Sequence, residues 1–229
     1  MSASVTPQYL LEGAVYALEQ CGLLIGDANL LYRSGSYATA VALAAFAREE
    51  QGRWRILLDL RREVLGGKSV TIEDINDRCD DHVTKQKAGM LGLTTRADRG
   101  SGLGRLLQSR FEAPPGSNEW KEADDTLAKI DRGKKKRVPG ERHEQRMSAL
   151  YVDPVSIGLW NRPALAISQM SAWAFLTDAR NDYSIQQCDR YTNLEVLEAI
   201  DPELHNALEQ WPERPTLPIV EMLMLPSPE

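Results

Sequence analysis

Two adjacent carboxylates, Glu49 and Glu50, close the apolar run AVALAAFAREE. Neighbouring side chains on a helix point about 100° apart, so only one of the two can face a buried site. A stripe of small residues that ends at Ala47 continues by a helical step of three to Glu50. The pattern therefore favours Glu50 as the inward carboxylate; the alternative is that both lie in solvent and pair with Arg53 or Arg55.

A histidine and a lysine form a second candidate site. His82 and Lys85 are three residues apart and fall on one face of a helix expected from about Ile72 to Leu91. Arg78 precedes them on the same helix, and such a cluster of cations suits phosphate binding. The alternative is that His82 is a structural residue.

A third candidate is the pair Arg137 and His143, separated by the five residues VPGER. An arginine, a short spacer and a histidine is the arrangement of a metal-independent ribonuclease. The guanidinium would stabilise charge on the scissile phosphate and the imidazole would move a proton. A chance match in a flexible loop is the competing interpretation, and the lysines at Lys134, Lys135 and Lys136 could bind RNA there without cutting it.

The segment LYVDP, residues 150–154, places a phenol and a carboxylate beside a turn. Tyr151 and Asp153 either pack and cap the turn, or they orient His82 or Lys85 in a shared polar site. Sequence spacing leaves both interpretations open.

Composition limits the other possibilities. The chain of 229 residues has a formal net charge of −6, so binding to nucleic acid would require a local basic cluster. Its three cysteines are far apart and form no CxxC pair, which gives no indication of a zinc site or a disulfide framework. No phosphate-binding loop or dinucleotide fingerprint is present, and we expect neither a metal nor a cofactor. No apolar run approaches the roughly 20 residues needed to cross a bilayer, so we expect a cytoplasmic protein without a membrane segment.

The apolar residues recur at helical spacing and predict an all-α fold in a single domain over residues 1–229. Two long antiparallel helices, at about 9–33 and 36–66, should form a hairpin. The region of about 94–142 is rich in Gly, Pro and charged residues and is expected to be a flexible basic insertion, with one short helix at about 119–130. Further helices are expected at about 143–150, 167–179 and 193–210, before a Pro-rich tail at about 211–229.

The segments DANLLYRSGSYATAVALAAFAREEQGR, HVTKQKAG, SALYVDP and GLWNRPA together resemble the AbiV family of bacterial abortive-infection proteins, within the HEPN superfamily. The resemblance extends from about Gly13 to Ala179. Arg53 stands where the family usually has a lysine. The most specific parts of the match are the first helical hairpin with Glu49 and Glu50, and LYVD. The site residues that match the AbiV pattern are Glu50, His82, Lys85, Tyr151 and Asp153.

This resemblance implies a HEPN-like helical bundle, defence against bacteriophage and arrest of translation. HEPN proteins often form homodimers with an RNA-cleaving cleft between the protomers, so we expect a homodimer that acts on RNA or on the translation machinery, with a phage-encoded component as a possible activator. The expected activity is metal-independent RNA cleavage. The alternative is a noncatalytic protein that blocks translation by binding RNA, a ribosomal component or a phage protein.

Overall fold

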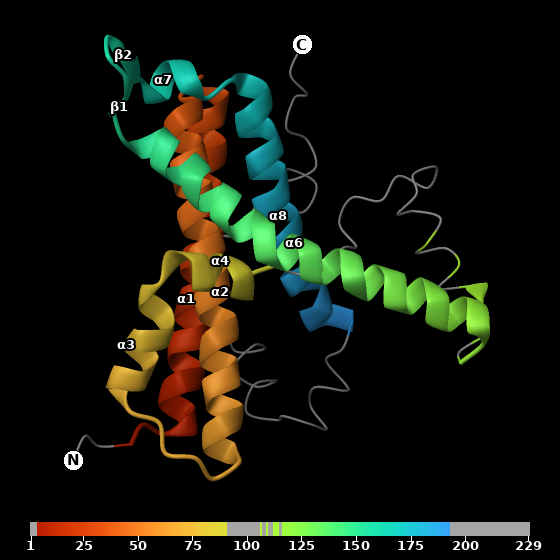
Figure 1. Cartoon of the computed structure of the whole chain (residues 1–229). Helices are drawn as coiled ribbons and strands as arrows, with labels where there is room; N and C mark the ends of the chain where they lie inside the picture. The colour runs from red at the N-terminus through yellow and green to blue at the C-terminus, as the bar shows by residue number, and fades with distance from the viewer. Residues whose placement is uncertain (1–3, 91–105, 107–108, 110–111, 115, 193–229) are drawn as a thin grey trace.

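A long antiparallel helical hairpin forms the centre of the molecule (Figure 1). The computed structural model describes residues 4–90, 106, 109, 112–114 and 116–192. Helix α1 spans Pro7–Arg33 and helix α2 spans Tyr37–Leu65. Gly35 makes the tight turn between them with a φ of 81°, a conformation that favours glycine. The predicted hairpin is therefore confirmed almost to the residue.

Two short helices follow where the sequence predicts one. Helix α3 spans Ile72–Asp80 and α4 spans His82–Ala88. Asp81 lies between them in an extended conformation, and its side chain accepts a hydrogen bond of 2.6 Å from the backbone N–H of Thr84. This N-cap starts a new helix in a new direction, so the prediction of a single continuous helix is wrong.

The largest difference from expectation is helix α6, which spans Asn118–Leu150. The sequence predicts a mostly irregular segment to about residue 142, yet the helix continues through Gly133 and Pro139. Its C-terminal half packs against α2 and α4, and Pro139 is fully buried. At Pro139, tertiary packing thus overrides a residue that locally disfavours a helix. The N-terminal half extends away from the hairpin (Figure 1).

A small β-hairpin follows α6. Strand β1 (Asp153–Ser156) pairs antiparallel with strand β2 (Leu159–Asn161) around a turn at Gly158, whose φ is 80°. Helix α7 spans Pro163–Ala166, and α8 spans Gln169–Thr192. The expected helix at 193–210 and the Pro-rich tail lie outside the described residues.

The core consists of two apolar clusters along the central hairpin. One lies between α1 and α2 and includes Leu18, Leu57 and Leu60, and the other joins both helices to α8 through Leu176. Arg48 of α2 also pairs with Asp182 of α8 inside the protein. The all-α bundle predicted from sequence is confirmed. In the part of the chain that the structure describes, no helix is long and apolar enough to cross a membrane.

Candidate functional site

Glu49 lies at the centre of a buried polar cluster. It belongs to α2, and only 3% of its surface is exposed. Its Oε2 lies 2.7 Å from Nδ1 of His82 and 3.7 Å from Nζ of Lys85, and its Oε1 lies 3.5 Å from Nη1 of Arg146. One carboxylate therefore collects three basic side chains that come from α4 and α6. We call Glu49, His82, Lys85, His143 and Arg146 the Glu49 cluster.

Two glycines bring α4 close enough to α2 for these contacts. A Cβ atom built on Gly52 would lie 1.9 Å from the backbone oxygen of Lys85, and one built on Gly89 would lie 2.8 Å from the backbone oxygen of Arg48. No side chain can be accommodated at such distances. The glycine that follows Glu49 and Glu50 in the EEQG sequence is therefore the residue that permits the backbone of α4 to lie against α2.

A buried amide also fixes the position of α4. Gln86 is 1% exposed, and its Nε2 donates a 3.1 Å hydrogen bond to the backbone oxygen of Ala45 on α2. Gln86 follows Lys85 directly, so this bond and the glycine contact hold the same turn of α4. His82 and Lys85 are thus presented to Glu49 by a rigidly seated helix.

Helix α6 contributes His143 and Arg146, which are three residues apart and share a face. The His143 ring stacks near the His82 ring, with centroids 6.0 Å apart and an interplanar angle of 24°. The Arg146 guanidinium carbon lies 5.6 Å from the centre of the Phe46 ring, a cation–π geometry that holds it beside Glu49. The site therefore contains two histidines from different helices.

The contacts of His82 indicate its tautomer. Nδ1 has two neighbours: Glu49 Oε2 at 2.7 Å and Nη1 of Arg146 at 3.4 Å. A short contact to a buried carboxylate is best satisfied when Nδ1 carries the proton and donates it. Nε2 of a neutral ring then keeps its lone pair, and the side chain is 42% exposed. His82 is thus oriented as a group that could accept a proton from a bound molecule.

The charges of the cluster favour an anion. Lys85 and Arg146 are 5% and 6% exposed, and Glu49 is the carboxylate that both contact. Two cations beside one carboxylate give these three groups a net positive charge, and the resulting field favours an anion such as a phosphate at the exposed edge of the cluster, where His82 lies. Among the described residues, no group of His, Cys, Asp and Glu side chains is arranged to hold a metal ion.

The structure corrects the choice between the two adjacent glutamates. Glu49 faces the cluster, while Glu50 is half-buried and pairs with Arg53 at 3.4 Å. Burial raises the pKa of Glu50 above its usual value, and the charges of Arg53 and Lys85 offset this in part. The stripe ending at Ala47 identified the face that meets α1, but α4 and α6 cover a second face of α2, to which Glu49 points.

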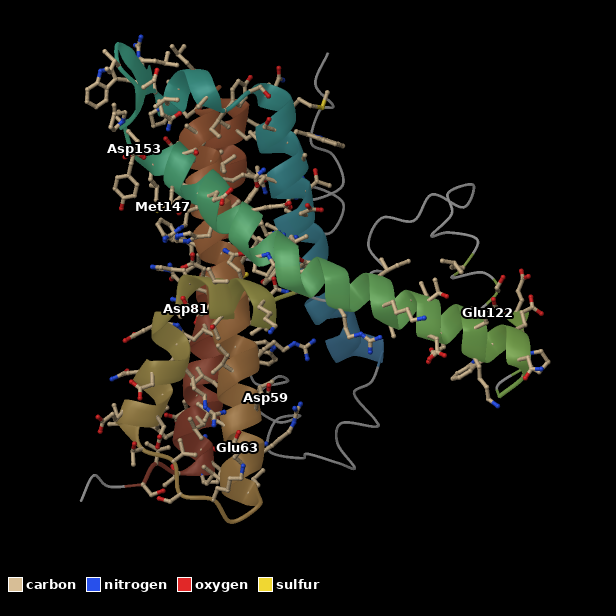
Figure 2. The ribbon with its side chains drawn as sticks, viewed as in Figure 1. Asp59, Glu63, Asp81, Glu122, Met147 and Asp153 are labelled. Atoms are coloured by element: carbon tan, nitrogen blue, oxygen red, sulfur yellow. The ribbon has the colours of Figure 1, made fainter. Side chains whose placement is uncertain are left out.

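Three other predicted site residues lie away from the cluster. Arg78 is exposed and pairs with Glu63 at 2.8 Å, which also holds the pKa of the Glu63 carboxyl below its usual value. Tyr151 and Asp153 are exposed after the end of α6, and no described interaction joins them to His82 or Lys85. In Figure 2, Asp153 lies at the start of the β-hairpin, whereas Asp81, the neighbour of His82, lies at the start of α4. The structure therefore does not bring Tyr151 or Asp153 into a shared polar site with His82 or Lys85.

The predicted pair Arg137 and His143 lies on one regular helix, not in a loop. Six residues at about 100° each separate the two positions by roughly 120° around the helix, so they begin on different faces. The side chains of residues 134–137, which include the three lysines, lie outside the described part. His143 reaches the cluster through its ring contact with His82, and the arginine of the cluster is Arg146, three residues later, which contacts Glu49.

Arg146 is the cluster member that sequence reasoning missed. The sequence does place Arg146 beside His143, because residues 143–150 are predicted to be helical and two residues three apart share a helical face. The predicted pair instead uses Arg137, which precedes the histidine by a five-residue spacer.

A helical bundle with a buried site of histidine, arginine, lysine and glutamate is consistent with the HEPN class that the sequence resembles. The HEPN_AbiV family model, described as AbiV, matches residues 9–181. The chain therefore belongs to the AbiV family and is a HEPN-type abortive-infection protein. No curated protein and no solved structure shows a significant match.

Proposed function

We propose that this protein is an anti-phage effector that arrests translation by cutting RNA without a metal ion, and that the Glu49 cluster is its active site. The observation that carries the proposal is the 2.7 Å contact between Glu49 Oε2 and His82 Nδ1, which leaves the far side of a partly exposed imidazole available. A carboxylate that orients a histidine in this way is a recurrent device for general-base catalysis.

The chemistry follows from the positions of the two histidines. Nε2 of His82 would take the proton of a ribose 2′-hydroxyl, and the 2′-oxygen would attack the adjacent phosphorus as the bond to the 5′-oxygen breaks. His143, when protonated, would give its proton to that leaving oxygen. Lys85 and Arg146 would stabilise the charge that develops on the phosphate. The products are a 2′,3′-cyclic phosphate and a 5′-hydroxyl.

The biological setting of the proposal comes from the family. Membership in the AbiV family supports a role in phage defence. We propose that the protein acts in the cytoplasm, that RNA or the translation machinery is its target, and that a phage-encoded component activates it. We also propose a homodimer; the apolar tail segment LPIVEMLML, which prompted this idea in the sequence, lies outside the described residues.

The decisive experiment is incubation of the purified protein with total RNA in the presence of a metal chelator. Cleavage by the wild type, and its loss in a folded His82→Ala variant, is the expected result. Arrest of translation in a cell-free system without any RNA cleavage, even when lysate of infected cells is added, would contradict the ribonuclease proposal.

A second candidate function is inhibition of translation by binding alone. Exposed apolar residues gather on the β-hairpin and α7: Ile157 is fully exposed, and Trp160 and Leu165 are 58% and 72% exposed. Such a surface is unusual on a protein that works alone. If binding is the whole function, a Trp160→Ala and Leu165→Ala double variant should abolish translation arrest, while His82→Ala should leave it intact.

A further inference from the structure

A cavity of about 320 Å³ opens between α1, α2 and α3. Its floor is apolar and consists of the buried residues Leu10, Leu57 and Cys79. Gly13 also lines it, and the absence of a side chain at this position leaves space between α1 and α2. The volume is at the lower end of the range for small-molecule sites and suits one flat ring system.

The rim of the cavity is aromatic and polar. Tyr9 and Tyr16 of α1 are 52% and 64% exposed, although tyrosines usually bury much of their ring. Arg53 provides N–H donors, while Glu12 and Asp80 provide carboxylate acceptors. Exposed aromatic faces offer stacking to any nucleobase, and the polar rim can pair with the edge of the base. The two carboxylates disfavour a phosphate inside the cavity itself.

This cavity adjoins the Glu49 cluster. Arg53 follows Glu49 by four residues on α2, a rise of about 6 Å along the helix. Asp80 precedes His82 by two residues at the junction of α3 and α4. Glu50 lies between the two sites: it pairs with Arg53 of the cavity rim, and the charge of Lys85 in the cluster also acts on its carboxyl group. A strand whose phosphate lies at His82 could therefore place a neighbouring base over the cavity.

We propose that the cavity between α1, α2 and α3 binds a nucleobase of an RNA strand whose phosphate lies at the Glu49 cluster. This proposal rests on the proposed function, since it assigns the RNA to the same site. In this arrangement the sugar–phosphate chain lies against the positively charged Glu49 cluster, and the tyrosine-flanked cavity next to it binds the base. Affinity for RNA should then depend on its bases and not only on its charge.

Position 13 offers a variant that fills the cavity with little strain. A Cβ atom at Gly13 would meet only Cδ1 of Leu57, at 3.4 Å, which is close to ordinary contact. Gly26, on the same helix, has open space around it and provides the matched control. Both positions are inside α1, so Gly13→Leu and Gly26→Leu gain similarly in helix propensity. Tyr16→Ala is a second test variant. The Tyr16 side chain is mostly exposed, so its removal should change the stability of the fold little.

The test measures binding of two probes by fluorescence anisotropy. One probe is a 2′-O-methylated RNA octamer of mixed sequence, which lacks the nucleophile and cannot be cut. The other is an octamer of the same sugar–phosphate chain without bases. The wild type and Gly26→Leu should bind the first probe about tenfold or more tightly than the second. Gly13→Leu and Tyr16→Ala should lower this ratio to near one, with unchanged melting temperature for Tyr16→Ala.

The outcomes separate this proposal from the proposed function. Equal binding of both probes by the wild type, or a ratio that persists in both test variants, overturns the base site, whatever the protein does to unmodified RNA. A base-dependent ratio that the test variants remove, in a protein that fails to cut unmodified RNA even when lysate of infected cells is added, supports the base site and contradicts the ribonuclease.

Discussion

Oε2 of Glu49 lies 2.7 Å from Nδ1 of His82, although the two residues are 33 positions apart in the chain and belong to different helices. The contact exists because Gly52 and Gly89 let α4 approach the backbone of α2. Through this contact the buried Glu49 carboxylate orients the His82 imidazole. Lys85 and Arg146 contact the same carboxylate.

The two adjacent glutamates should respond very differently to the same substitution. Glu49→Gln leaves Lys85 and Arg146 buried without their counter-charge, and breaking a buried ion pair in this way costs about 3 kcal/mol or more. Glu50→Gln alters a half-buried residue whose partner, Arg53, is 41% exposed, and should change stability little. Denaturant unfolding of both variants measures the difference. Equal destabilisation by the two substitutions would contradict the assignment of Glu49 as the inward carboxylate.

The stability of Glu50→Gln relative to the wild type should depend on pH. Burial raises the pKa of Glu50 in the folded protein above its ordinary value of 4.5. In the pH interval between the pKa of the unfolded state and that of the folded state, the folded protein therefore binds more protons than the unfolded chain. The wild type therefore loses stability as the pH rises through this interval, and the variant does not. Glu50→Gln should be at least as stable as the wild type near about pH 7, and this advantage should disappear below about pH 4. Thermal melts across this range test the sign, and an advantage that grows toward acid would refute it.

Gly52→Ala should displace α4 and disable the site. The added methyl group would meet the backbone of Lys85, which cannot move away as a side chain could. Overpacking of this kind costs about 1–3 kcal/mol and should also separate His82 from Glu49. Gly26→Ala is the control, because its methyl group meets nothing within 4 Å. Melting temperature and RNA cleavage should both fall for Gly52→Ala alone; a fully active Gly52→Ala protein would show that the close contact is dispensable.

His143 and Arg137 should also behave differently. His143 stacks near His82, so His143→Ala should lower RNA cleavage by about 10²-fold or more through loss of proton transfer. Arg137 begins on another face of α6, so Arg137→Ala should weaken RNA binding modestly, with an effect that salt removes. Cleavage rates at saturating and limiting RNA separate the two effects. A loss of rate in Arg137→Ala as large as in His143→Ala would instead support the ribonuclease pair predicted from the sequence.

The hairpin of α1 and α2 could be predicted from sequence because its signals are local. In α1, Leu11, Val15 and Leu18 recur at helical spacing, and Gly35 marks the turn. Capping signals also define helix ends well, as Gly66 does for α2. Asp81 is a similar signal in front of α4, but its type alone does not distinguish an N-cap from an aspartate inside a polar helix.

The site could be predicted only in part, because its geometry depends on contacts between distant segments. His82 and Lys85 were found because they share one turn of one helix. The choice of Glu50 over Glu49 failed because the pattern of one helix cannot show that α4 and α6 cover its second face. The prediction for residues 131–142 was wrong for a related reason: Pro139 disfavours a helix locally, but it is buried where α6 packs against the bundle.

The most direct test of the central claim is the rate of RNA cleavage by His82→Ala in a metal chelator, with and without added imidazole. The wild type should cut RNA to 2′,3′-cyclic phosphate ends, and His82→Ala should lose about 10²-fold or more of this rate. Because the His82 side chain is 42% exposed, the variant should keep a melting temperature near that of the wild type. Imidazole should restore part of the rate if a proton acceptor is what was removed. Cleavage at the wild-type rate by a folded His82→Ala protein would contradict the account.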